Sequence, residues 1–215
     1  MTKPMHPLTR ATLLGLPVAL PAAAVCVAYL DEPLALAIDG FRRSSPFLNR
    51  YTDDLPDLLL PFVLILSAWM WTAWFLRVRR GFRDERAAFY RFAGTVLPAA
   101  HVAKAAFKTL FGRVETRAWL RDPLPDGFHW FNSGNGHSGF PSGHMTVIAA
   151  VAAACWIHFP EHRPLLIFAP LLLGAALVVT NYHFLGDVVA GGYLGLAVAA
   201  AIRRALERYD SRAER

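Results

Sequence analysis

Long apolar runs separated by short polar stretches dominate the chain from residue 11 onward. A helix needs about 20 consecutive apolar residues to cross a hydrocarbon layer of roughly 30 Å. Several runs approach that length, so the pattern predicts an all-α integral membrane protein, folded as a six-transmembrane-helix bundle. The predicted helices cover residues 11–30, 55–76, 87–107, 144–159, 165–182 and 188–202.

The first apolar segment allows two interpretations. It follows a basic start with Lys3 and Arg10, and small residues stand at 22–24, as they do in a cleaved signal peptide. Its apolar stretch is longer than the core of a typical signal, which favours a retained helix. No repeat or low-complexity linker interrupts the chain, so we expect one membrane-embedded domain over residues 1–215.

Cations are distributed unevenly between the polar stretches. They gather in residues 1–10, in the stretch 77–91 and in the basic tail 203–215. Cytoplasmic loops of membrane proteins collect Lys and Arg, so both termini are expected in the cytoplasm. Residues 107–143 and the turn 183–187 then face outward from the inner (cytoplasmic) membrane.

The overall composition supports this interpretation. Hydrophobic residues make up 55% of the chain and charged residues only 18%, below the roughly 25% usual for soluble domains. The net charge of +6 alone would suggest a nucleic-acid partner. No basic stripe interleaved with aromatic residues is present, so we expect none. Cys26 and Cys155 lie inside apolar runs and are expected to be packed thiols.

Ionisable side chains collect in the stretches expected to face outward. The turn "NYHFLGD" places His183 and Asp187 four residues apart, so in a helical turn they share a face. A carboxylate on one imidazole nitrogen fixes the tautomer and leaves the other nitrogen as a nucleophile. Taken alone, such a pair is more often a helix cap at the membrane interface.

A second polar stretch, "PSGH", stands directly before an apolar run. Pro141 and Ser142 suit the start of a helix, and Gly143 lets a ligand approach the backbone. Free N–H groups at a helix start bind anions, and His144 in the first turn is placed to donate a proton. A helix cap followed by an interfacial polar residue is the simpler explanation.

The stretch "KTLFGR" supplies cations, since Lys108 and Arg113 flank a glycine. Guanidinium binds phosphate oxygens bidentately, and an ammonium group acts as a point charge. Cations that snorkel at a membrane interface are the common alternative. Together the three stretches provide cations, an anion-binding helix start, an acid and an oriented imidazole, which phosphoryl transfer requires.

"KTLFGR", "FPSGH" and "HFLGDVVAG" resemble, in order and separation, the three signature motifs of the type-2 phosphatidic-acid phosphatase superfamily. The resemblance implies a metal-independent membrane lipid phosphate phosphatase that needs no cofactor and acts on a phosphomonoester or pyrophosphate through a phosphohistidine. By motif position, His183 is the implied nucleophile, Asp187 orients it and His144 protonates the leaving group. The implied phosphate-binding groups are Lys108, Arg113, Ser142 and the Gly143 N–H.

Two motif arginines are replaced in this chain. The first motif of the superfamily has an arginine where Glu115 stands, and the third motif has one where Leu177 stands. Arg117 and Asn181 are the candidates to supply the missing phosphate contacts. The replacements bear on substrate affinity and class more than on fold.

Two alternative functions are compatible with the same residues. A divergent, non-catalytic lipid-phosphate binder or transporter would use the same pocket, although binding alone needs no pair of acid and nucleophile. A metal site would use the outward histidines, but no H-E-x-x-H or close histidine pair at ligand spacing supports it. The sequence leaves the lipid and the oligomeric state open.

Overall fold

A computed structural model describes residues 6–44, 58–122, 127–132, 134 and 136–213. Within these ranges the regular structure is helical, as the sequence predicts, and one isolated antiparallel bridge joins Arg113 to Phe128. The α-helices are α1 (Pro7–Val25), α2 (Asp31–Ser44), α4 (Leu59–Arg79), α5 (Glu85–Phe111), α6 (Thr116–Arg121), α7 (Gly143–His158), α8 (Arg163–Val179) and α9 (Leu185–Ala213). A π-helical segment (Cys26–Leu30) joins α1 to α2, and a 3₁₀ turn (Pro160–His162) precedes α8.

Each of the six predicted apolar segments coincides largely with a helix. Residues 58, 159 and 180–182 lie beyond the helix ends, and residues 55–57 lie outside the described ranges. Four helical stretches are long and apolar enough to cross a membrane: Pro7–Ser44, Leu59–Arg79, Pro160–Val179 and Leu185–Ala213. Helix α7 is apolar but has only 16 residues, and α5 is not among the four. A membrane-embedded, all-α fold is therefore supported, while six complete crossings stay a prediction.

The helices differ in how much apolar surface they bury. Helices α5, α7 and α9 pack against one another, and their small and β-branched residues Val96, Ala100, Ala150, Ala154 and Ala199 are fully buried. Helix α4 adds Val63 to this core, yet α1, α4 and α8 leave many large apolar side chains exposed, among them Leu14, Ile65 and Leu171. Exposed apolar surface on this scale suits contact with lipid.

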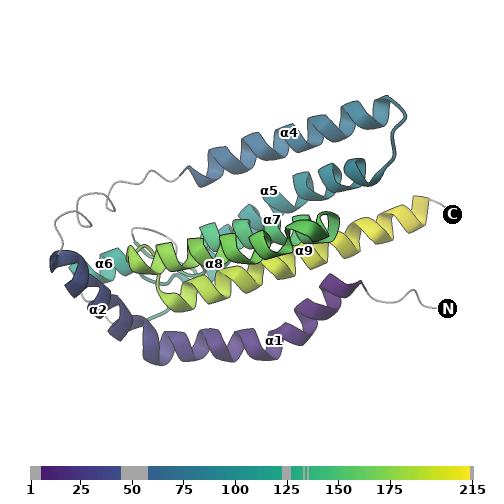
Figure 1. The fold of residues 1–215 in the computed structure, drawn as a ribbon. Helices are drawn as coiled ribbons and strands as arrows, with labels where there is room; N and C mark the ends of the chain where they lie inside the picture. Colours follow the sequence, from purple (N-terminus) through teal and green to yellow (C-terminus); the bar gives the residue numbers. More distant parts are fainter. Residues whose placement is uncertain (1–5, 45–57, 123–126, 133, 135, 214–215) are drawn as a thin grey trace.

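Both ends of the described chain lie at the same end of the bundle. Figure 1 shows the start of α1 and the end of α9 together, while α2, α6 and the turn between α8 and α9 lie toward the opposite end. This arrangement agrees with the prediction that the termini share one side. Which side of the membrane that is stays a prediction.

Helices α7 and α9 approach closely because glycines of α9 face the backbone of α7. A Cβ added at Gly191 would lie 2.5 Å from the carbonyl oxygen of Ser142, and one added at Gly195 would lie 2.3 Å from that of Thr146. These two glycines are four residues apart and therefore share one face of α9. Their missing side chains let α9 approach the start of α7, where "PSGH" lies.

The segment after α5 folds back over the end of that helix. Gly112 ends α5 in the left-handed region with φ 56°, and a Cβ there would lie 2.0 Å from the carbonyl oxygen of His129. Only glycine fits this position, which accounts for the glycine of "KTLFGR". The sharp turn directs Arg113 back toward the other helices.

Replacing Gly195 by alanine is expected to destabilise the fold, because the new methyl group meets backbone atoms that cannot move independently of α7. Overpacking of this kind costs about 1–3 kcal/mol. A lower melting temperature of the detergent-solubilised protein would report the effect. The matched control is Gly192→Ala on the same helix, whose Cβ would meet only Met145 Cε at 3.6 Å. Equal melting temperatures for the two variants would contradict this account of the α7–α9 contact.

Candidate active site

Backbone hydrogen bonds join the three predicted motifs. The amide of Gly139 donates to the carbonyl oxygen of Arg113 (2.8 Å), and the amide of Ser142 donates to the carbonyl oxygen of Asp187 (2.9 Å). Residues far apart in the sequence thereby meet at the end of the bundle opposite the termini. The structure brings "KTLFGR", "FPSGH" and "HFLGDVVAG" together as one site.

His183 and Asp187 lie in contact at the start of α9. Nδ1 of His183 is 3.5 Å from Oδ2 of Asp187, and both side chains are buried. His183 lies in the turn before α9, whereas Asp187 lies in the first turn of the helix, where a carboxylate is favourable. Oδ2 of Asp187 also accepts a hydrogen bond from the amide of Phe184 (3.1 Å), which holds the carboxylate facing the turn that carries His183.

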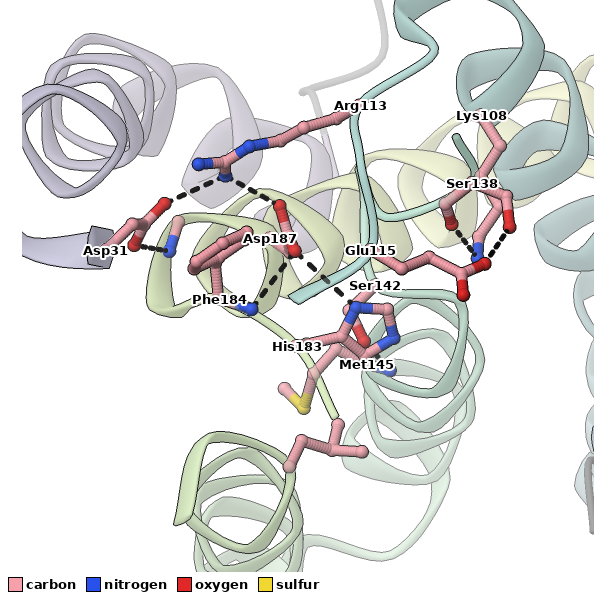
Figure 2. Close-up of polar contacts among 12 residues, drawn as sticks. Asp31, Lys108, Arg113, Glu115, Ser138, Ser142, Met145, His183, Phe184 and Asp187 are labelled. Carbon is pink, nitrogen blue, oxygen red and sulfur yellow. Dashed lines mark hydrogen bonds and ion pairs between the residues drawn. The ribbon is translucent and has the colours of Figure 1, made fainter. Parts of the chain in front are cut away.

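Arg113 lies between two carboxylates, as Figure 2 shows. Its Nη1 is 2.8 Å from Oδ1 of Asp187 and 2.8 Å from Oδ2 of Asp31, a residue of α2. All three side chains are at most 1% exposed, so the charges interact in a low-dielectric surrounding. These contacts orient Asp187, and the expectation that Arg113 also binds phosphate stays a prediction.

The start of α7 has the capped geometry that the sequence predicts. Ser142 is the N-cap, and its Oγ accepts from the amide of Met145 (3.4 Å). Ser142 and Gly143 are both buried beside the turn of His183. The side chain of Lys104 lies against Gly143, since a Cβ added there would be 2.7 Å from Lys104 Cδ and 3.2 Å from its Nζ. An ammonium group thus lies next to the first turn of α7.

His144 and His183 both contact the ring of Tyr182. The ring centroids lie 5.5 Å apart for His144 and Tyr182, and 5.3 Å apart for Tyr182 and His183. The guanidinium of Arg117 lies over the same tyrosine ring, 5.1 Å from its centroid, and Nη2 donates to the carbonyl oxygen of Thr180 (3.2 Å). The structure therefore gathers the predicted acid, the predicted nucleophile and one cation around Tyr182.

Lys108 lies on the opposite side of Ser142 from Asp187 in Figure 2. Its Nζ donates to the carbonyl oxygen of Ser138 (2.5 Å), and Oγ of Ser138 donates to Oε1 of Glu115 (2.6 Å). Glu115 stands where the superfamily motif has an arginine, and here it holds the loop near Lys108. A carboxylate at this place lowers the positive charge on that side of the site.

Asn181, a predicted phosphate contact, and Leu177, at the second replaced arginine, both make packing or structural contacts. Asn181 is buried, and its Nδ2 donates to the carbonyl oxygen of Ala35 on α2 (3.2 Å), which points to a role in holding α2. Leu177 stands at the second replaced arginine and packs with Met145 and Val188. Its carbonyl oxygen accepts from the amides of Tyr182 (2.9 Å) and His183 (3.2 Å), so it still shapes the turn that carries His183.

Sequence reasoning missed three residues that contact this site. Asp31 directly follows the predicted segment 11–30, and Lys104 lies inside the predicted segment 87–107. A charge within or next to an apolar segment is the signal that identifies them. Tyr182 stands beside His183 in "NYHFLGD", but nothing in the spacing indicates that it also reaches His144. All three contacts arise between segments that are distant in sequence.

Within the described part of the chain, no group of three or more His, Cys, Asp or Glu side chains is placed to hold a metal ion. His129 and His137 do form a ring contact, with centroids 4.6 Å apart. Two histidines without a further ligand do not make a zinc site, which takes at least three protein ligands.

Comparisons with known proteins agree with the motifs. The family model described as the PAP2 superfamily matches residues 89–210. Two curated relatives are both named lipid A 1-phosphatase: one from Rhizobium etli is 35% identical over 92 residues, and one from Rhizobium johnstonii is 39% identical over 75 residues. These alignments cover 37% and 31% of this chain, and 40% and 31% of the relatives' own length.

One solved structure is also similar, a transmembrane PAP2-type phosphatidylglycerolphosphate phosphatase from Bacillus subtilis. It is 22% identical with a TM-score of 0.49, and the match covers 93% of this chain and 96% of that one.

Removal of the buried guanidinium by Arg113→Met is expected to destabilise the protein strongly, because two buried carboxylates would lose their shared cation. Breaking a buried ion pair in this way costs roughly 3–5 kcal/mol. Thermal unfolding in detergent measures the loss. The control is Arg43→Met, since Arg43 pairs with Asp39 at the surface of α2 and exposed pairs contribute about 0–1 kcal/mol. Similar melting temperatures for the two variants would contradict a stabilising role of Arg113.

Proposed function

The chain belongs to the PAP2 superfamily, and on that premise we propose that it is a metal-independent lipid phosphate phosphatase. Its substrate would be a phosphomonoester or pyrophosphate of a membrane lipid. The observation that carries the proposal is the contact of His183 with Asp187, placed directly beside the capped start of α7. A binding protein has no need of an imidazole oriented by a carboxylate.

In the proposed reaction His183 is the nucleophile. With Nδ1 protonated and facing Asp187, the lone pair on Nε2 is free to attack phosphorus. The nitrogen–phosphorus bond forms while the bond from phosphorus to the lipid oxygen breaks. His144 gives its proton to that departing oxygen, so the lipid leaves as an alcohol, or as a lipid phosphate from a pyrophosphate.

Water completes the cycle in a second displacement. His144, now neutral, takes a proton from a water molecule, and the water oxygen attacks phosphorus of the phosphohistidine. The nitrogen–phosphorus bond breaks, inorganic phosphate is released, and both histidines return to their starting states. Tyr182, which contacts both rings, would keep them at a fixed separation.

The phosphate oxygens would be held by backbone amides at the start of α7 and by cations around it. Lys104 lies against Gly143, and Lys108 is four residues further along α5, so both project from the same face of that helix. Two ammonium groups near a helix N-terminus repel one another, and the positive end of the helix dipole repels both. An anion bound between them would offset this repulsion. Arg117, over Tyr182, would supply the charge that Leu177 cannot.

Several observations support an outward-facing site in the inner membrane. The cations of the sequence concentrate at the end of the bundle where the chain begins and ends, and the site lies at the other end. A lipid phosphate presented at the outer leaflet would reach His144 and His183 from the membrane surface. The two curated relatives are named for lipid A, which makes a glycolipid phosphate the first substrate class to test.

Purified protein in detergent is expected to release inorganic phosphate from at least one of phosphatidic acid, phosphatidylglycerol phosphate, undecaprenyl pyrophosphate and lipid A, with or without EDTA. His183→Ala should reduce release to background, and His144→Ala should reduce it about 100- to 10,000-fold, the range of general acid–base catalysis. His162→Ala, an exposed histidine before α8, is the control and should be fully active. Full release by His183→Ala would overturn the mechanism. Binding without release would support the lipid-phosphate binder or transporter instead.

Replacement of Lys104 by methionine is expected to raise KM about 10- to 150-fold, because a charged hydrogen bond to phosphate contributes roughly 1.5–3 kcal/mol. Lys104→Arg keeps the charge and should recover most of the loss. Phosphate release at varied substrate concentration gives both constants. An unchanged KM in Lys104→Met would show that this ammonium group does not bind substrate.

A further inference from the structure

Asp31 begins α2, and its carboxylate is fully buried at the far side of the site from α7. Both of its oxygens are used. Oδ1 accepts a hydrogen bond from the amide of Gly186 (2.8 Å), and Oδ2 accepts one from Nη1 of Arg113 (2.8 Å). Asp31 lies outside residues 89–210, the segment that the superfamily model covers.

The contacts of Asp31 continue to His183 through two further groups. Nη1 of Arg113, which donates to Asp31, also donates to Oδ1 of Asp187 (2.8 Å). The other oxygen of Asp187 is the one that faces Nδ1 of His183 (3.5 Å). Figure 2 shows the four side chains in this order, from Asp31 to Arg113, Asp187 and His183.

The charges of this chain of contacts explain why a second carboxylate is useful. One guanidinium beside a single carboxylate would neutralise it and weaken its attraction for a positive imidazole. Two carboxylates share the one guanidinium here, so with both of them ionised the buried group carries a net negative charge. That charge favours the cationic ring that forms when Nε2 of His183 bonds to phosphorus.

Helix α2 also holds the turn that carries His183 through one backbone amide and one side chain of that turn. The amide of Gly186, one residue before Asp187, donates to Asp31, and Nδ2 of Asn181 donates to the carbonyl oxygen of Ala35. These contacts lie on either side of His183 in the sequence. A Cβ at Gly186 would be 2.7 Å from Oδ2 of Asp31, so the backbone of the turn packs directly against this carboxylate.

We propose that Asp31 is a positioning residue for phosphoryl transfer. It acts through Arg113 and Asp187 on His183, and it fixes the turn 181–187 through the amide of Gly186. The role rests on the proposed function of His183 as nucleophile. Its effect on the structure of the turn 181–187 is a separate property, which can be measured without any substrate.

The test compares Asp31→Asn with Asp39→Asn in the full-length protein. Both variants replace one carboxylate of α2 by an amide of the same size, but Asp39 pairs with Arg43 at the surface. For Asp31→Asn we expect kcat to fall about 10- to 100-fold, the usual effect of misplacing a catalytic group, while KM changes less than about threefold. Asp39→Asn should match the wild type in both constants.

Hydrogen–deuterium exchange of the same proteins supplies the second readout. Amides of residues 181–187 should exchange faster in Asp31→Asn than in the wild type, whereas those of α4 should be unchanged, which excludes general unfolding. Unchanged exchange and kcat in Asp31→Asn would overturn the proposal. A fall in kcat that is matched by faster exchange throughout the protein would also overturn it, because the role would then be structural only.

The two proposals fail in different ways. If the wild type releases no phosphate from any lipid tested, the proposed function is wrong, and the exchange of residues 181–187 still decides whether Asp31 positions the turn. If the wild type is active and Asp31→Asn equals it, the function stands and the role of Asp31 is wrong.

Discussion

The buried guanidinium of Arg113 is the contact on which the rest of the site depends. It links Asp31 of α2 to Asp187 of α9, and it comes from the segment that follows α5. Three parts of the chain are therefore held together by one side chain that is buried together with both of its partners. Because an unpaired buried charge is costly, any arrangement that separates these groups is disfavoured. The geometry of His183 follows from this constraint, since Asp187 is fixed by it.

The packing of α9 on α7 provides the second constraint. Gly191 and Gly195 remove the side chains that would hold the helices apart, and the amide of Ser142 then reaches the carbonyl oxygen of Asp187. The N-cap of one helix is thus bonded to the first turn of another. Close helix packing through small residues is a general feature of membrane proteins, where it replaces the hydrophobic drive between helices. Here the same packing sets an anion-binding helix start beside the proposed nucleophile.

The loss of two motif arginines is accommodated differently at each position. Leu177 fills its place with apolar packing against Met145 and Val188, while Arg117 of α6 reaches the end of the same turn from another direction. Glu115 accepts a hydrogen bond from Ser138 near Lys108, and Lys104, one helical turn earlier on α5, lies against Gly143. Lys104 and Arg117 are thus cations that lie near the start of α7 and the turn of His183. Under the proposed function, their placement bears on substrate class.

The sequence by itself determined the all-α membrane fold, the Ser142 cap and the pairing of His183 with Asp187, because these depend on local features: apolar run length, cap residues and a spacing of four. It also identified the superfamily, since motif order and separation are linear properties. It did not place Asp31, Lys104 or Tyr182, and it did not show that Arg113 faces two carboxylates or that Asn181 holds α2. Those facts depend on which helices meet and at what depth. Only the tertiary structure decides them, because contacts between distant helices are set by packing and by the pairing of buried charge.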